Sequence, residues 1–222
     1  MTNNIAIDGP AGAGKSTIAK KLAKELGYIY VDTGAMYRAM AYHFLQNNIA
    51  SDNESEIAKS CKNVDVSISY IDGEQQVLLN GQNISDKIRN EEVGNMASAT
   101  SVYPVVRTKL VELQRQLASK ENVIMDGRDI GTVVLPNANV KIYLTASSKV
   151  RAKRRFDELT AKGEDCNFDD IEKDIIDRDY RDMHRETSPL KQADDAILLD
   201  TSDMDIDQVV SRMKEIIETA DK

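Results

Sequence analysis

Residues 9–16 read Gly-Pro-Ala-Gly-Ala-Gly-Lys-Ser and match the pattern G-x-x-x-x-G-K-[ST]. The apolar run at residues 5–7 precedes this stretch as an expected strand, and the periodic apolar residues of 15–26 follow it as an expected helix. Backbone N–H groups of such a glycine-rich loop point at phosphates, and the helix N-terminus adds partial positive charge. The stretch therefore predicts a loop that binds the phosphates of a nucleoside triphosphate.

The polar residues of this loop have separate expected roles. Lys15 reaches the β- and γ-phosphates, and the hydroxyl of Ser16 is placed to ligate Mg²⁺. A chance glycine-rich turn is disfavoured because the strand, the lysine, the hydroxyl and the helix are all in register. The residues expected to bind the nucleotide are Gly9, Pro10, Ala11, Gly12, Ala13, Gly14, Lys15, Ser16 and Thr17.

The composition is that of an ordinary globular protein of 222 residues, 41% hydrophobic and 30% charged. A formal net charge of −8 argues against a nucleic-acid-coating role. Cys61 and Cys166 have neither metal-ligand nor disulfide spacing, the N-terminal segment reads as a strand, and no apolar run reaches membrane-spanning length. We expect a cytoplasmic protein without nucleic-acid or membrane partners, and we expect it to be a monomer.

Strands alternate with helices along most of the chain, which predicts a parallel α/β sheet covered by helices. Further strands are expected at residues 28–31, 123–125, 140–145 and 196–199, with a helix beginning near Pro104 and a last helix capped by Asp205. One hairpin breaks the rhythm, with strands at 64–70 and 76–79 and a tight turn at Asp72-Gly73. The prediction is one domain over residues 1–222 with a small antiparallel insertion at about 63–88.

Arginines are concentrated near the C-terminal third, where six of the twelve fall between Arg151 and Arg185. They form two expected helical clusters, and the spacing of positions 178, 181 and 185 predicts one shared helix face. A polar, glycine-containing break at residues 161–167 separates the clusters. We expect residues 151–185 to be a helical lid that closes over the donor nucleotide and excludes water. A solvated, charged helical hairpin is the alternative.

The arginines favour phosphoryl transfer to an acceptor over a hydrolytic switch. Forked guanidinium groups can neutralise the two anions that meet when the acceptor is itself a phosphate. A guanine-reading N-K-x-D is absent from the sequence, and neither His43 nor His184 is well placed as a base. A phosphate acceptor needs no such base because it arrives already anionic. The residues therefore predict a P-loop kinase acting on a nucleotide phosphate, with an NTPase switch as the competing hypothesis.

Two further motifs follow expected strands, D-T-G-A-M-Y-R at 32–38 and D-G-R-D-I-G-T at 126–132. Ligands bind beyond the carboxyl ends of the strands in open α/β sheets. Thr33 and Arg38 would present a hydroxyl and a cation to a small acceptor. Asp126 and Asp32 are both candidates to assist Mg²⁺ through water, and the sequence leaves that choice open.

These motifs, together with E-E-V-G-N-M-A-S at 91–98 and R-D-Y-R-D-M-H-R at 178–185, run in the order of the bacterial cytidylate kinase (CMP kinase) family. The chain closely resembles that family over most of its length. The resemblance implies Mg²⁺-assisted phosphorylation of CMP, and of dCMP, by ATP in pyrimidine nucleotide metabolism. It also implies that the hairpin insertion belongs to an enlarged acceptor-binding region. A kinase for UMP or AMP is the competitor within the same class.

The resemblance also implies roles for particular residues. Cytosine has an exocyclic amine that donates to a carboxylate, whereas uracil presents an acceptor there and would leave Asp129 unpaired. Alternatively, Arg128 and Asp129 simply pair with each other in their loop. The implied acceptor contacts are Thr33, Arg38 and Arg128 for the phosphate, Ser98, Arg107 and Asp129 for the base, Arg178 and Asp182 for the sugar, and Arg185 for the phosphates. The expected catalytic groups are Lys15, Arg128, Arg155 and Arg185, and the ATP contacts extend to Arg151 and Arg155.

Overall fold

The computed structural model describes residues 2–220, and these form two compact units. The first unit comprises residues 3–28 and 124–220, and the second comprises residues 29–123. The main sheet has five strands in the order β2-β6-β1-β7-β8, and a separate three-stranded sheet has the order β3-β4-β5. A sheet flanked by helices confirms the α/β fold class expected from the sequence. The single-domain boundaries stay a prediction.

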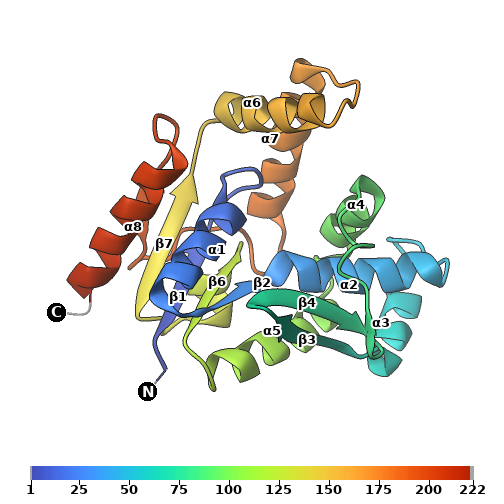
Figure 1. The fold of residues 1–222 in the computed structure, drawn as a ribbon. Helices are drawn as coiled ribbons and strands as arrows, with labels where there is room; N and C mark the ends of the chain where they lie inside the picture. Colours follow the sequence, from blue (N-terminus) through green and yellow to red (C-terminus); the bar gives the residue numbers. More distant parts are fainter. Residues whose placement is uncertain (1, 221–222) are drawn as a thin grey trace. The chain divides into compact units, whose positions relative to one another are not determined.

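The first unit alternates strands and helices. Its elements are β1 (Asn4–Asp8), α1 (Lys15–Leu26), β6 (Val123–Gly127), the short π-helix η1 (Ile130–Val134), β7 (Val140–Thr145), α6 (Ser148–Ala161), α7 (Phe168–His184), β8 (Ile197–Asp200) and α8 (Ile206–Ala220). β1 pairs in parallel with β7, and β7 pairs in parallel with β8. Figure 1 shows α1 and α8 packed together and α6 running beside α7. Parallel strands covered in this way are apolar along most of their length.

The core of the first unit follows the apolar periodicity of the sequence. Ile5 and Ile7 of β1 are fully buried, and the inward face of α8 is Val209, Met213 and Ile216. The Asp205 carboxylate accepts the Gln208 N–H at 2.8 Å, which confirms the expected N-cap. The strand expected at 196–199 lies one residue later, at Ile197–Asp200.

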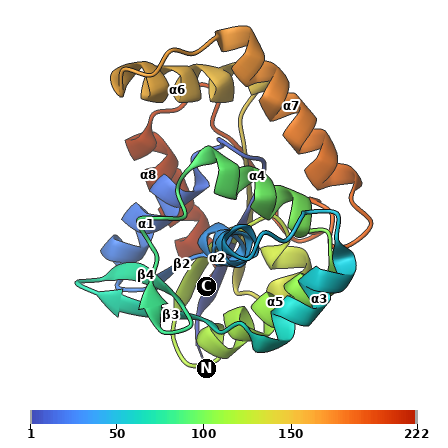
Figure 2. The same cartoon turned by 90° about the vertical axis from the view of Figure 1, so that its right-hand side faces the viewer.

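The second unit is built around one buried helix. Its elements are β2 (Ile29–Asp32), α2 (Thr33–Gln46), α3 (Glu54–Asn63), β3 (Val66–Ile71), β4 (Glu74–Leu79), β5 (Gln82–Asn83), α4 (Glu91–Thr100) and α5 (Pro104–Ala118). Figure 2 looks along α2, which packs against α3, α4, α5 and the small sheet. Met36, Met40 and Phe44 of α2 are fully buried because their spacing places them on faces that its neighbours cover.

The small sheet is the antiparallel insertion that the alternating pattern predicts. β3 and β4 pair antiparallel from Val66 opposite Leu79 to Ile71 opposite Glu74. Asp72 and Gly73 have φ of 52° and 78°, the two positive values that a tight hairpin turn requires. The first strand was expected to begin at Val64, but it begins at Val66. Val64 instead closes α3 by donating its N–H to the Ser60 carbonyl at 3.2 Å. β5 is a third strand that the sequence did not indicate.

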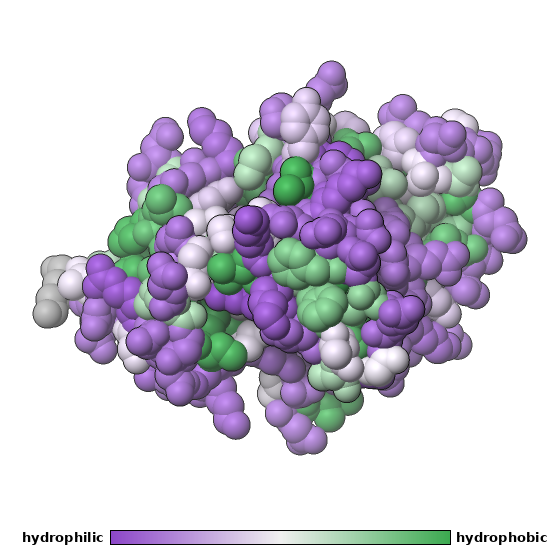
Figure 3. Space-filling model, turned by 90° about the horizontal axis from the view of Figure 1, so that it is seen from above, coloured by the Kyte–Doolittle hydropathy of each residue, from purple (hydrophilic) through white to green (hydrophobic). Residues whose placement is uncertain are grey.

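The surface seen in Figure 3 is mainly hydrophilic, with small and separate apolar patches. Within residues 2–220, no helix is both long and apolar enough to cross a membrane.

Candidate functional site

The loop between β1 and α1 has the backbone that a phosphate cradle requires. Gly9 has φ of 147°, and a Cβ at this position would lie 1.9 Å from the Leu144 carbonyl oxygen of β7. Gly14 has φ of 87° and is the N-cap of α1, to which it offers no capping side chain. Only glycine fits these two positions without strain. The start of α1 is therefore suited to an anion in place of a side-chain cap.

The polar side chains of this loop are held by hydrogen bonds to other parts of the first unit. Lys15 is 5% exposed, and its Nζ donates to the Pro10 carbonyl at 2.7 Å. Ser16 Oγ donates to Asp126 Oδ2, at the end of β6, at 2.9 Å. A hydroxyl oxygen beside a carboxylate oxygen is the kind of ligand pair that Mg²⁺ accepts. These residues therefore fit the cation that accompanies a nucleoside triphosphate.

The charge state of Lys15 is sensitive to what occupies the loop. Burial and the positive charge of Arg128 lower the pKa of Lys15 to about 7, although Asp126 and Asp8 oppose the shift. A phosphate chain against the ammonium would favour the charged form again. We therefore expect this lysine to take up protons when the triphosphate binds near neutral pH.

In the same unit, several arginines surround one carboxylate. Arg128 Nε donates to Asp182 Oδ2 at 2.9 Å, and Arg185 Nη1 lies 3.8 Å from Asp182 Oδ1. Burial alone would raise the pKa of Asp182, but the charge and hydrogen bond of Arg128, with Arg178 and Arg185 nearby, lower it below the ordinary value. The structure brings together four of the residues expected to bind the acceptor. Arg128 pairs with Asp182, whereas the sequence alternative paired it with Asp129.

The C-terminal end of α7 corrects one expectation from the sequence. Positions 178, 181 and 185 were expected to share a helix face, but α7 ends at His184 and Arg185 is its C-cap in extended conformation. Arg185 turns back and donates from Nε to the Ser188 carbonyl at 2.8 Å. The Asp182 main chain continues this turn, since its carbonyl accepts the Leu190 N–H at 2.7 Å. Arg185 therefore comes to Asp182 from a turn and not from the helix face.

The two arms of the expected lid are α6 and α7, separated by residues 162–167. Arg151 is buried at the base of α6, where Nη2 contacts Asp179 of α7 at 2.6 Å and Nη1 donates to the Ala11 carbonyl at 3.0 Å. Arg155 lies further along α6, is about half exposed, and pairs with Glu158 at 3.0 Å. Arg151 thus ties the phosphate loop to both arms, while Arg155 is on an open surface. Their roles toward ATP stay predictions.

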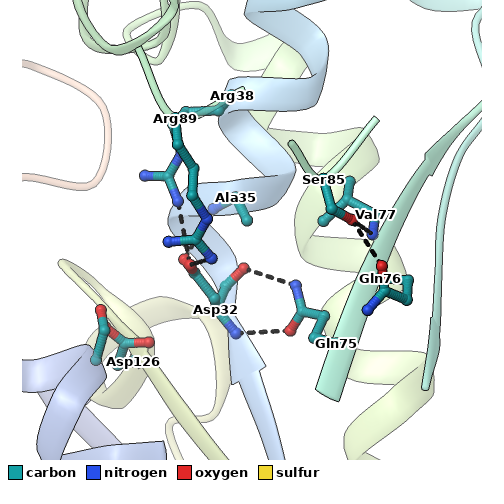
Figure 4. Close-up of polar contacts among 10 residues, drawn as sticks. Asp32, Ala35, Arg38, Gln75, Gln76, Val77, Ser85, Arg89 and Asp126 are labelled. Carbon is teal, nitrogen blue, oxygen red and sulfur yellow. Dashed lines mark hydrogen bonds and ion pairs between the residues drawn. The ribbon is translucent and has the colours of Figure 1, made fainter. Parts of the chain in front are cut away.

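In the second unit, a cluster gathers around Asp32 at the end of β2 (Figure 4). Asp32 Oδ1 accepts the Ala35 N–H at 2.8 Å and so caps α2, while Oδ2 accepts from Arg38 at 3.1 Å. Arg89 reaches the same oxygen at 3.9 Å. The side-chain amide of Gln75 binds both main-chain groups of Asp32: its Oε1 accepts the Asp32 N–H at 2.8 Å, and its Nε2 donates to the Asp32 carbonyl at 3.2 Å. The small sheet thereby fixes the start of α2, where Thr33 is buried.

The other predicted residues of the second unit also lie together. Arg107 is buried, donates to the Ser101 carbonyl at 3.0 Å, and lies over the Tyr37 ring at 5.4 Å from its centroid. Ser101 in turn donates its hydroxyl to the Ser98 carbonyl at 2.9 Å. The end of α4 and the start of α5 are thus joined near Ser98 and Arg107, whose role toward the base stays a prediction.

Three residues with clear structural roles in the site were not singled out from the sequence. Gln75 and Asp179 act through pairings that only the folded chain creates. Asp8 is buried at the end of β1 and accepts the N–H groups of Ile130 and Gly131. A charged residue closing an otherwise apolar strand, directly before the phosphate loop, was the available signal for Asp8.

A helix-covered α/β sheet with this loop after its first strand is the fold of P-loop nucleotide-binding proteins. Two solved structures share the fold: shikimate kinase from Bacteroides thetaiotaomicron, with TM-score 0.50 and 14% identity, covering 97% of this chain and 98% of that one; and an uncharacterized protein from Eubacterium ventriosum, with TM-score 0.52 and 16% identity, covering 99% of both chains. Sequence identities this low show a shared fold and nothing about function.

Sequence comparison identifies the family. The family model described as Cytidylate kinase matches residues 5–219. Cytidylate kinase from Lactobacillus johnsonii is 52% identical over 98% of this chain and 95% of its own, and cytidylate kinase from Carboxydothermus hydrogenoformans is 48% identical over 96% of both. The chain belongs to the cytidylate kinase family, which confirms the resemblance seen in its motifs.

Proposed function

We propose that this chain transfers the γ-phosphoryl group of ATP to CMP and to dCMP with the help of Mg²⁺, giving CDP and dCDP. Membership of the cytidylate kinase family supports CMP as the acceptor and ATP as the donor. The observation that carries the chemistry is the gathering of Arg128, Arg178 and Arg185 around Asp182, in the unit that also buries Lys15. Such a set of cations suits a reaction between two phosphates, for which positioning and charge neutralisation are the main requirements.

At the donor end, residues Gly9–Thr17 hold the phosphate chain and Lys15 stabilises the group in transfer. Ser16 and Asp126 are the residues that would hold Mg²⁺, which would supply charge neutralisation on the phosphates when bound. Asp126 is preferred over Asp32 because it accepts the Ser16 hydroxyl, whereas Asp32 caps α2 and binds Arg38.

At the acceptor end, the proposal assigns each part of CMP to its own residues. Asp129 accepts from the cytosine amine, and a keto oxygen in its place would face a carboxylate without a donor. The complete assignment is Thr33, Arg38, Arg128 and Arg185 for the phosphate, Ser98, Arg107 and Asp129 for the base, and Arg178 and Asp182 for the sugar.

Residues 151–185 act as the lid in this proposal. Arg151 anchors both arms at their base, and Arg155 would reach the donor when the lid closes. Closure excludes water, the competing acceptor. We further propose that the enzyme works in the cytoplasm as a monomer.

The acceptor assignment is tested by measuring ADP release from ATP–Mg²⁺ with CMP, dCMP, UMP, AMP and GMP. We expect CMP and dCMP to have the highest kcat/KM, with UMP at least about tenfold lower because one hydrogen bond is lost and Asp129 is left unpaired. Equal turnover of UMP or AMP would contradict the cytosine assignment.

The sugar assignment is tested separately with Arg178→Met. If Arg178 contacts a sugar hydroxyl, its loss should change the ratio of kcat/KM for CMP over dCMP. Equal losses for the two acceptors would refute that role while leaving the base assignment intact. Arg181→Met is the matched control, because Arg181 is exposed on the same helix.

A further inference from the structure

The buried carboxylate of Asp8 has no part in the substrate contacts proposed above. Asp8 closes β1 and is 5% exposed. Its Oδ1 accepts the Ile130 N–H at 2.8 Å and its Oδ2 accepts the Gly131 N–H at 2.7 Å. One carboxylate thus binds two successive main-chain donors that lie more than a hundred residues away in the sequence.

These two donors belong to the start of η1, directly after Arg128 and Asp129. The Asp129 carbonyl accepts the N–H groups of Val133 and Val134, so Asp129 is the N-cap of η1. The first N–H groups of a helix have no acceptor within the helix itself. Asp129 occupies the N-cap position, but its side chain makes no capping bond. Asp8 supplies the cap instead, from the neighbouring strand.

The two acceptor oxygens of Asp8 match the two donors of the turn. A Cβ on Gly131 would lie 3.4 Å from Asp8 Oδ2, an ordinary contact, and 3.2 Å from the Lys141 side chain, which would have to give way slightly. An asparagine at position 8 would offer one acceptor oxygen and one NH₂ donor, and it could satisfy only one of the two N–H groups. The two-oxygen carboxylate is therefore specific to this pair of donors.

We infer that Asp8 is a positioning residue for acceptor recognition, because its carboxylate fixes the turn that orients Arg128 and Asp129. The inference rests on the proposed role of Asp129 in reading cytosine. The backbone of the phosphate loop is held separately, by the close approach of Gly9 to Leu144. Because Asp8 also raises the pKa of Lys15, a change at Asp8 should weaken the use of ATP with every acceptor. Only its effect on the turn should alter the ratio between acceptors.

The electrostatics of Asp8 provide a second readout. Burial raises the pKa of Asp8 to about 6, with the nearby Asp129 adding to the shift and the two N–H groups and Lys15 opposing it. Tyr143 of β7 also faces this carboxylate, and Lys141 packs beside Gly131. Protonation below pH 6 would place a hydrogen on one of the two accepting oxygens and weaken the cap. Selectivity for CMP should therefore fall as the pH drops through 6.

The experiment measures kcat/KM for CMP and UMP, and KM for ATP, at pH 7.5 and 5.5. The ratio for CMP over UMP is the useful quantity, because titration of the acceptor phosphate near pH 6 affects both acceptors alike. In Asp8→Asn we expect the ratio at pH 7.5 to fall about tenfold, as for one lost hydrogen bond, whereas any change in KM for ATP that arises through Lys15 should be the same with either acceptor. The wild-type ratio should fall between pH 7.5 and 5.5, and that of Asp8→Asn should stay flat.

Three further variants make the outcome decisive. Asp207→Asn is the matched control and should behave as wild type, because the Asp207 carboxylate is exposed and pairs with Lys21. Gly131→Ala adds a methyl group 3.2 Å from the Lys141 side chain and 3.4 Å from Asp8 Oδ2; by displacing the turn without altering Asp8, it should lower the ratio even if Asp8→Asn fails to fold. If Asp129→Ala lowers the ratio but Asp8→Asn and Gly131→Ala do not, the inference is overturned. If Asp129→Ala also leaves the ratio unchanged, the proposed base reading by Asp129 is wrong and the inference falls with it.

Discussion

Asp182 in the first unit and Asp32 in the second unit both hold arginines, but they do so in different ways. Asp182 lies near the end of α7, and its carboxylate contacts Arg128 at 2.9 Å and Arg185 at 3.8 Å. Asp32 divides its carboxylate, with one oxygen capping α2 and the other accepting from Arg38 at 3.1 Å. Asp182 therefore acts mainly by ordering cations, whereas Asp32 also contributes to the folding of a helix.

This difference separates effects on activity from effects on stability. Changes around Asp182 should appear mostly in the rate of phosphoryl transfer, because they disturb cations proposed to meet the phosphates. Changes at Asp32 should appear in both the unfolding free energy and the affinity for CMP. Substitutions at the two carboxylates and their arginines test this separation.

Arg128→Met should lower kcat with saturating CMP by roughly 100- to 1,000-fold, the loss typical of one removed transition-state contact. Steady-state kinetics measures this, and a urea titration checks that the variant folds. Arg212→Met is the matched control, because Arg212 pairs with Glu215 on the exposed face of α8. A kcat within threefold of wild type would show that Arg128 does not meet the reacting phosphates.

Replacing Asp32 in two ways separates its two roles. Asparagine retains helix capping and loses the charge, whereas alanine loses both. We expect Asp32→Ala to lower the unfolding free energy by about 1 kcal/mol more than Asp32→Asn does. Both variants should raise KM for CMP, since Arg38 loses its anionic partner. Equal stability of the two variants in urea titrations would contradict the capping role.

The smallest effect is a pH dependence of stability at Asp182. Because the pKa of Asp182 is lowered in the folded protein, its carboxylate stabilises the fold above the ordinary carboxyl range, near pH 4. That contribution should disappear as the pH falls further, through the lowered pKa. Wild type should therefore lose stability relative to Asp182→Asn between about pH 4 and pH 2.5 in urea titrations. A difference that stays constant over this range would contradict the lowered pKa.

Much of the fold was predictable because local signals agreed with the tertiary structure. The strand at 140–145 and the helix at 15–26 have the predicted bounds, since apolar periodicity and end signals coincide there. The strands expected at 28–31 and 196–199 each begin and end one residue later, as β2 (Ile29–Asp32) and β8 (Ile197–Asp200). The expected start of a strand at Val64 was wrong, because an alternating pattern cannot show that this residue already closes the preceding helix.

The sequence predicted the part of the candidate site that lies within one continuous motif. It did not predict the contacts between segments that are distant in the sequence. Gly9–Ser16 forms the expected loop, because the positive φ angles of its glycines and the helix that begins at Lys15 are local features of the motif. The pairing of Arg128 with Asp182 and the capping of η1 by Asp8 join segments 54 and 122 residues apart. Spacing along the chain does not encode such contacts. Buried carboxylates that bind main-chain N–H groups are therefore best found in the structure.

Transfer of phosphate to CMP, rather than to water, is the claim on which this account depends. It is tested most directly by ³¹P NMR of ATP–Mg²⁺ with the enzyme, with and without CMP, and with Lys15→Ala as the catalytic control. We predict one CDP for each ADP formed, negligible ADP without CMP, and a strongly reduced rate for Lys15→Ala. ADP release that proceeds equally without CMP, or without CDP formation, would contradict the account and identify a hydrolytic P-loop protein.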